Sequence, residues 1–398
     1  MSAIAAPDSE EALSGLIKDA AARKAPIEIR GGGTRRDIGR PMQAEETISL
    51  DGLRGVTLYE PGALTVIAQA GTPLADVEAA LGAEGQRLAF EPPDWRALLG
   101  SEGEPTIGGA VATNFSGPRR IQTGACRDSL IGVRFVDGSG EILKNGGRVM
   151  KNVTGYDLVK LLCGSYGSLG VLTEVAFKVG PAPESAVFLM MQGLDDATAI
   201  AALSAGLGSP YEVTGAAHLP EDCTPEGDGA VTMLRLEGFA ENMAHRGPAL
   251  RALLSRFGAV ELIEDPAQVA SGWAFIRNVE PFARTEGAVW RISVKPTDGP
   301  IIGARLRESL GARVFYDWGG GLVWALVPEE AEGDAGAALI RREIAALGGH
   351  ATLIRGSASL RAAAPVFHPE PPALARLTAE IKAKFDPAGV LNPGRIVN

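Results

Sequence analysis

The chain of 398 residues has few cysteines, and their spacing does not fit a metal site. Cys126, Cys163 and Cys223 lie far apart, and no Cys-x-x-Cys pair occurs. We therefore expect neither a structural zinc site nor an iron–sulfur cluster held by this chain alone. A small, odd number of cysteines is typical of a reducing compartment.

Long apolar runs and a targeting segment are also missing from the sequence. No run of about 18 apolar residues occurs, which excludes a membrane-spanning helix. The N-terminal stretch MSAIAAPDSEEAL has neither the basic region nor the apolar core of a signal peptide. A net charge of −10 argues against a general nucleic-acid surface. We expect a cytoplasmic protein, with docking to partner subunits or at the inner membrane left open.

Histidine is scarce, and no catalytic arrangement of it is visible. His218, His245, His350 and His368 stand alone, without the spacing of paired metal ligands. Each is interpreted as a surface or strand residue. No Ser-His-Asp arrangement or pair of carboxylates stands out, so the sequence names no catalytic acid or base and no metal ligand.

Glycine, in contrast, is abundant: 51 residues, nearly double the usual share of about 7%. Most dense glycine lies before residue 180, in three segments. These are EIRGGGTRRDIG (28–39), TIGGAVATNFSGPRR (106–120) and the turn at 164–170 between a predicted helix and a strand. An isolated Gly-Gly pair is most often a tightly packed helix start or barrel corner. Three such segments predict loops that converge on one large, flat, anionic ligand, for which a dinucleotide cofactor is the obvious candidate.

The composition changes near residue 180, where Gly-Pro and Pro183 indicate a domain boundary. From residue 186 the pattern predicts the order β-α-β-β-α-β, which recurs from about residue 288. The segment WGGGL at 318–322 lies between two predicted strands and is interpreted as a glycine hairpin. The arrangement of strands across the two repeats does not follow from the sequence. We expect an α+β protein with three parts: 1–182, 183–370 and 371–398.

The order of these motifs resembles a known family. RGGGT, TIGGAVATN, GYDLVKLLCGSYGSLGVLTE and the C-terminal FDPAGVLNPGRIVN are similar to the FAD-binding domain of the vanillyl-alcohol oxidase and p-cresol methylhydroxylase family. The resemblance covers residues 25–180 and the last dozen residues. It implies a two-part FAD-binding domain with an antiparallel-sheet cap, here built from two ferredoxin-like βαββαβ units.

The resemblance also implies which residues bind FAD. The first loop holds the pyrophosphate, the second runs beside the pyrophosphate, ribose and flavin, and the third contacts the adenine half. The C-terminal Asn-Pro-Gly returns toward the flavin, although a simple terminating turn is an alternative. The implied residues are Arg30, Gly31, Gly32, Gly33, Thr34, Thr106, Gly108, Gly109, Thr113, Asn114, Ser116, Gly117, Gly164, Ser165, Gly167, Gly170, Val171 and Asn392.

Within this family the chain is most similar to the FAD-binding subunits of bacterial glycolate oxidase. Family members that tether FAD through a histidine carry it in the first loop, where this chain has Thr34 and Arg35, so we expect non-covalent FAD. The HxGDGNxH motif of relatives that oxidise D-2-hydroxy acids is absent. The resemblance implies two partners: a larger related flavoprotein subunit and an iron–sulfur subunit.

Two main functional hypotheses remain open, and a third is less favoured. In the first, the chain alone oxidises a D-2-hydroxy acid. In the second, which the missing histidine motif favours, it is a cofactor-binding subunit of a complex that converts glycolate to glyoxylate. In the third, it is a flavoprotein for an unrelated alcohol, because a fold does not fix a function.

Overall fold

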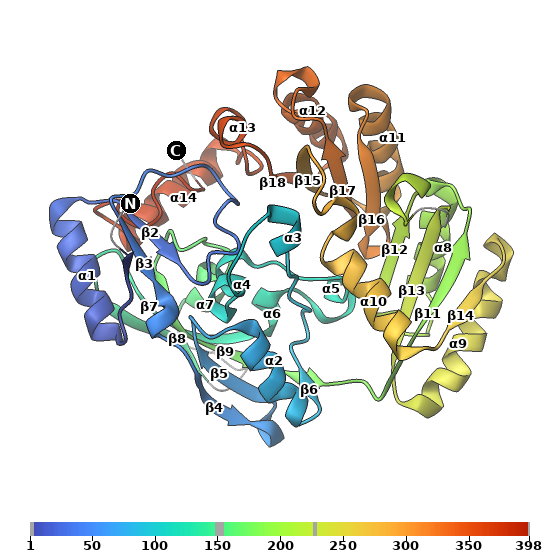
Figure 1. The fold of residues 1–398 in the computed structure, drawn as a ribbon, viewed down its shortest axis with the longest axis horizontal. Coiled ribbons are helices and arrows are strands. Elements are labelled where there is room, and N and C mark those ends of the chain that lie inside the picture. The colour runs from blue at the N-terminus through green and yellow to red at the C-terminus, as the bar shows by residue number, and fades with distance from the viewer. Residues whose placement is uncertain (1–3, 148–154, 226–228, 397–398) are drawn as a thin grey trace.

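The computed structural model describes residues 4–147, 155–225 and 229–396, which form two halves lying side by side (Figure 1). The first half contains a three-stranded and a five-stranded sheet, and the second contains an eight-stranded sheet. The C-terminal helix α14 (Pro372–Phe385) crosses back over the first half, so both ends of the chain lie there (Figure 1).

The first half begins with a helix that is specified locally. Ser9 caps α1 by accepting a hydrogen bond from the backbone N–H of Ala12, and Leu13 and Ile17 lie on its buried face. A small parallel sheet with the order β1-β3-β2 follows. The bounds are β1 Ile4–Ala5, α1 Glu10–Arg23, β2 Ile27–Arg30 and β3 Glu46–Ser49.

An antiparallel sheet with the order β4-β5-β9-β7-β8 completes the first half. Its strands are β4 Val56–Glu60, β5 Thr65–Gln69, β7 Leu130–Val136, β8 Ile142–Gly146 and β9 Val171–Lys178. Central strand β9 is buried along most of its length, on both faces. The connecting elements are α2 Leu74–Ala83, β6 Gln86–Arg87, α3 Arg96–Leu99, α4 Ile107–Thr113, α5 Arg120–Thr123, α6 Cys126–Ser129, α7 Leu158–Leu162 and β10 Gly180–Pro181.

The second half, which we call the cap, repeats one unit twice. The first unit is β11 Ser185–Gln192, α8 Asp196–Leu207, β12 Gly215–Leu219, β13 Val231–Gly238, α9 Ala240–Leu254 and β14 Glu261–Ile263. The second is β15 Ala288–Ser293, α11 Gly299–Leu310, β16 Arg313–Asp317, β17 Leu322–Val327, α12 Ala337–Leu347 and β18 His350–Arg355. Helix α10 Pro266–Arg277 joins the units, and α13 Ala358–Ala363 and α14 Pro372–Phe385 follow them.

Both units of the cap share one eight-stranded sheet, β14-β11-β13-β12-β16-β17-β15-β18. Each unit therefore has the ferredoxin-like strand order 4-1-3-2, and the two meet edge to edge through β12 and β16, where His218 pairs with Tyr316. This pairing leaves no exposed sheet edge at the centre of the cap.

Between its two edge strands, the cap sheet is buried on both faces. Helices α8, α9, α11 and α12 cover one face, over a core that includes Trp290 and Tyr316. On the other face Phe315 and Trp324 pack with Trp95 and Phe115 of the first half. The strands are apolar nearly throughout, rather than alternating, because neither face meets water.

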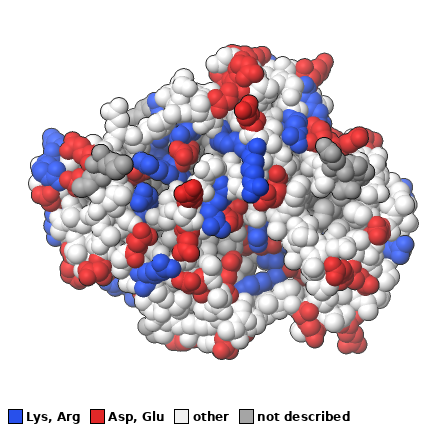
Figure 2. All heavy atoms as spheres, in the orientation of Figure 1, with Lys and Arg blue, Asp and Glu red and all other residues white. Residues whose placement is uncertain are grey.

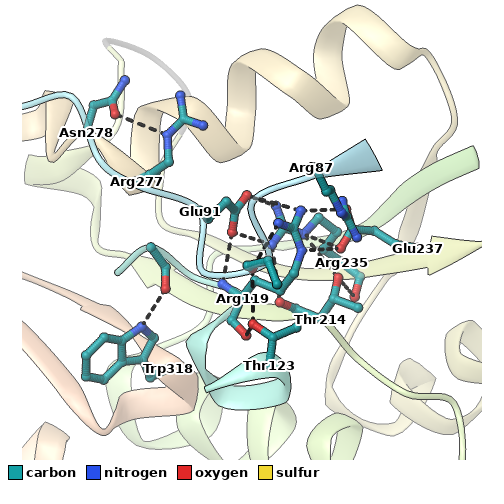
Figure 3. Close-up of polar contacts among 12 residues, drawn as sticks. Arg87, Glu91, Arg119, Thr123, Thr214, Arg235, Glu237, Arg277, Asn278 and Trp318 are labelled. Carbon is teal, nitrogen blue, oxygen red and sulfur yellow. Dashed lines mark hydrogen bonds and ion pairs between the residues drawn. The ribbon is translucent and has the colours of Figure 1, made fainter. Parts of the chain in front are cut away.

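A buried ionic network crosses the seam between the halves (Figure 3). Arg235 of β13 forms a two-pronged ion pair with Glu91, at 2.8 and 2.9 Å. Arg119 pairs in the same way with Glu237 of β13, at 2.8 and 2.9 Å, and Arg87 reaches Glu237 at 2.7 Å. Removing one member of such a network costs about 3–5 kcal/mol, because an unpaired buried charge remains. These pairs fix how the cap sits on the first half.

Within the described residues, no helix is long and apolar enough to cross a membrane.

Candidate functional site

A cleft of about 810 Å³, counting the solvent at its mouth, lies in the first half where the three glycine-rich segments meet. Twelve of the residues implied by the family resemblance line it: Arg30, Gly31, Gly32, Gly33, Thr34, Thr106, Gly108, Gly109, Thr113, Gly167, Gly170 and Asn392.

The first loop lies directly against the chain that leads into α4. A Cβ on Gly31 would lie 2.3 Å from Thr106 Oγ1, and one on Gly32 would lie 1.8 Å from the Glu104 carbonyl oxygen. Only Gly33 of the three has a positive φ, 76°. Gly32 therefore has to lack a side chain because a neighbouring backbone occupies the space, and not because of a positive φ.

Helix α4 forms the second wall of the cleft. Thr106 caps it by accepting a hydrogen bond from the Gly109 backbone N–H at 3.2 Å. Gly108 faces the sheet so closely that a Cβ would lie 2.6 Å from the Ala70 carbonyl oxygen. Small residues in this helix therefore place its backbone against both the sheet and the cleft.

The third turn and the C-terminal return close the cleft together. Asn392 Oδ1 accepts from the Ile29 backbone N–H at 2.9 Å, and its Nδ2 donates to the Tyr166 carbonyl at 2.7 Å. Gly167 has φ 70°, and a Cβ there would approach Asn392 Nδ2 to 2.8 Å. Asn392 thus ties the start of the first loop to the third turn, and both of its amide atoms already have backbone partners.

Six residues implied by the resemblance do not line this cleft: Asn114, Ser116, Gly117, Gly164, Ser165 and Val171. Asn114 ends α4 and accepts from the Arg127 N–H at 3.1 Å, and Ser116 accepts from the Cys126 N–H at 2.9 Å. Gly117 lies at the seam, where its carbonyl accepts from Trp318 Nε1 at 3.3 Å. These contacts hold the surrounding loops together.

Gly164, Ser165 and Val171 also have structural contacts. The Gly164 N–H donates to the Val111 carbonyl at 3.0 Å, the Ser165 carbonyl accepts from the Ser168 hydroxyl at 2.7 Å, and Val171 begins buried strand β9. Each of them supports the third turn behind the cleft wall.

Ten lining residues were not among the predicted cofactor contacts: Glu28, Ile29, Arg35, Arg36, Leu50, Pro105, Ala112, Tyr166, Leu172 and Arg395. Arg35 donates to Thr113 Oγ1 at 2.7 Å and to the Pro93 carbonyl at 2.8 Å. Burial lowers the pKa of Arg35 to about 10, so it keeps its positive charge at neutral pH. Arg35 directly follows the first loop in the sequence, and this position could have indicated it as a cofactor contact.

Arg395 brings a second buried cation to the cleft from the C-terminus. Its Nη1 donates to the carbonyls of Arg36 and Ile38 at 3.1 and 3.0 Å, while its Nε has no partner among the described residues. Burial lowers the pKa of Arg395, and Glu28 opposes this shift. Arg395 directly follows the Asn-Pro-Gly motif, and this position could have indicated it as a cofactor contact.

The cleft fits a dinucleotide pyrophosphate. It combines close backbone approach at glycines, basic side chains and a buried N–H donor without a partner, which are the features that bind such an anion. Histidine and cysteine are missing from its described lining, and Cys126 is fully buried behind it. The described residues contain no cluster of three or more potential metal ligands.

Comparison with known proteins agrees with this geometry. Residues 1–146 match the FAD binding domain family. The chain is 34% identical over 390 residues to the glycolate oxidase subunit GlcE of Escherichia coli (strain K12), covering 98% of this chain and 97% of the relative. The chain belongs to the family of that subunit. Its cofactor is FAD, and it is a member of an oxidoreductase family.

Two further likenesses cover different parts of the molecule. The glycolate oxidase subunit GlcD of Bacillus subtilis (strain 168) is 32% identical over 184 residues, which is 46% of this chain and 38% of that one. The solved structure of p-cresol methylhydroxylase has a TM-score of 0.71 at 15% identity, covering 99% of this chain and 88% of that one. The structural likeness extends over both halves and confirms the fold class.

Proposed function

We propose that the chain is the FAD-binding subunit of a complex that oxidises glycolate, or a close 2-hydroxy acid, to the 2-oxo acid. The observation that carries this proposal is the identity of 34% to a glycolate oxidase subunit over 98% of the chain. In the proposed assignment, residues 1–182 and 371–398 hold FAD and residues 183–370 form the cap. The chain's partners are a larger related flavoprotein subunit and an iron–sulfur subunit.

In this proposal the chain's own residues bind and orient the cofactor. The first loop, the start of α4 and the turn around Gly167 hold FAD without a covalent bond, together with Arg35 and Arg395. The lack of histidine and cysteine in the described cleft lining supports non-covalent binding. Bound FAD would supply the two-electron oxidant for a substrate that loses two electrons and two protons, with an external acceptor as the final destination of the electrons.

The test is the anaerobic visible spectrum of the purified chain with and without glycolate. A flavin spectrum that bleaches only after the sister subunits are added supports the subunit role. Bleaching of the chain alone supports the second candidate, a self-sufficient 2-hydroxy-acid oxidoreductase. Purification without FAD, combined with failure to bind added FAD, would overturn both.

A further inference from the structure

Arg291 is a buried cation at the seam with no polar partner in the described part of the chain. It lies on β15, and 8% of its surface is exposed. The structure gives its guanidinium no hydrogen bond or ion pair to a described residue. Its guanidinium carbon lies 4.9 Å from the Trp318 ring centroid and 5.8 Å from that of Phe115. No nitrogen of Arg291 is among the fully buried atoms without a partner in the described residues, so its N–H donors keep access to solvent and can bind an anionic ligand that enters the seam.

A second arginine reaches the same ring from the other half of the molecule. Arg120 of α5 lies 4.6 Å from the Trp318 centroid and is half-buried, and the structure gives its guanidinium no hydrogen bond to a described residue. Burial lowers the pKa of Arg291 to about 10, and the charge of Arg120 adds to the effect. Two cations from different halves are therefore held near one indole, despite their repulsion.

The other titratable groups near this pair leave it positively charged. Asp317 accepts from the Trp318 backbone N–H at 2.7 Å, and burial raises the pKa of its carboxyl to about 7, so it is only partly ionised at neutral pH. Burial, followed by the charge of Arg291, lowers the pKa of His350 and keeps this histidine neutral. Burial lowers the pKa of Arg120, and the charge of Asp128 opposes this shift without a direct ion pair between the two side chains.

The pair lies next to the cofactor cleft. The Phe115 ring that lies near Arg291 also lies 5.7 Å from the guanidinium of Arg35, a lining residue of the cleft. Tyr166, which also lines the cleft, lies 6.4 Å from Phe115 between ring centroids. In the space-filling view, basic side chains gather around the hollow between the halves of this acidic chain (Figure 2).

We propose that Arg120 and Arg291 bind the carboxylate of a small organic acid at the seam, beside the FAD cleft. A guanidinium presents paired N–H donors that match a carboxylate, and the rings of Trp318 and Phe115 exclude water and limit the size of the ligand. This inference rests on the proposed function, for which it places a substrate carboxylate on this chain. It makes both halves necessary for the site, because each supplies one arginine.

The experiment titrates the FAD-loaded full-length chain with oxamate, using isothermal titration calorimetry at constant ionic strength. Oxamate has the carboxylate and size of a small 2-hydroxy acid but cannot be oxidised at the neighbouring carbon, and neutral glycolamide is the matched ligand control. The variants are Arg120→Gln, Arg291→Gln and Arg291→Lys. Arg342→Gln is the matched control, since Arg342 lies on α12 with its side chain 70% exposed.

We expect wild type and Arg342→Gln to bind oxamate but not glycolamide. Each glutamine variant is expected to bind oxamate about tenfold more weakly or worse, and Arg291→Lys less so, with FAD content unchanged. Arg120→Gln keeps the test decisive if Arg291→Gln does not fold. Equal binding by wild type and the folded glutamine variants, or no binding by the wild type, would overturn the inference. Loss of FAD from the wild type would instead contradict the proposed function.

Discussion

Neighbouring glycines in the first loop meet different physical requirements. Gly32 faces the Glu104 carbonyl oxygen, where even a methyl group would lie at 1.8 Å. Gly33 has room for a Cβ, at 3.4 Å from the Arg30 side chain, but its φ of 76° costs a side-chain-bearing residue about 1–2 kcal/mol. Substitution at the first position therefore tests packing, and at the second it tests backbone conformation.

The first prediction is that Gly32→Ala weakens FAD binding. The added methyl forces the first loop away from residues 103–105, at a cost of about 1–3 kcal/mol, and displaces backbone that lines the cleft. The measurement is the FAD content after purification, with the far-UV circular dichroism spectrum as a check on folding. Gly62→Ala is the control, because a Cβ at Gly62 meets no atom within 4 Å. Wild-type FAD content in a folded Gly32→Ala chain would contradict the prediction.

At the scale of elements, the cleft depends on a segment from the far end of the chain. Residues after α14 run beside β2, where the Asn392 N–H donates to the Ile27 carbonyl at 3.0 Å. Lys382 of α14 also donates to the Ser168 and Leu391 carbonyls, at 2.8 and 3.0 Å. The C-terminal return therefore braces both the first loop and the third turn.

The second prediction is that Asn392→Ala lowers both stability and FAD affinity. Two backbone groups, the Ile29 N–H and the Tyr166 carbonyl, lose their partner, which costs about 1–3 kcal/mol. Thermal unfolding and FAD titration of the apoprotein are the measurements. The control is Asn242→Ala, at an exposed position of α9. If both variants match the wild type in melting temperature and FAD affinity, the bracing role is wrong.

At the scale of the whole molecule, the seam joins two halves that each have a core of their own and share a third apolar cluster. The ionic network of Figure 3 lies at one side of this seam, and the rings around Trp318 and Phe115 lie near the cofactor cleft. Burial opposes ionisation of Glu91, but Arg235 and Arg119 together lower its pKa to about 2. Charge pairing therefore prevails over desolvation, and the network holds the cap in place at neutral pH.

The third prediction concerns acid stability. The folded pKa of Glu91 lies below its ordinary value of 4.5, so its contribution to stability is present above pH 4.5 and is lost as pH falls toward 2. This single carboxyl accounts for about 3 kcal/mol of that loss. Glu91→Gln should destabilise the chain at pH 7 and flatten the decline in acid.

Denaturant unfolding between pH 2 and pH 7 measures both effects. Glu308→Gln is the control, because Glu308 is exposed on α11. An acid profile of Glu91→Gln that runs parallel to the wild-type profile would show that this ion pair does not hold the seam.

Much of the local structure and of the cleft could be predicted from the sequence. The three glycine-rich segments meet at one cleft, as predicted, because glycine is required wherever a backbone approaches another group closely. Asn114 and Gly164 were named as cofactor contacts, but they do not line this cleft and instead have structural contacts behind its wall. The sequence pattern marks residues that shape a loop and those that line the cleft beside it in the same way.

By itself the sequence determined the loops, the helices and strands, and their order, because these follow from local periodicity and backbone freedom. The joining of β12 to β16 and the pairing of Arg119 with Glu237 were decided only by the tertiary structure. So was the approach of Arg120 and Arg291 to Trp318, a residue that in sequence is only the start of a glycine hairpin. Such contacts join residues a hundred or more positions apart, and they depend on how whole cores pack, which no local pattern encodes.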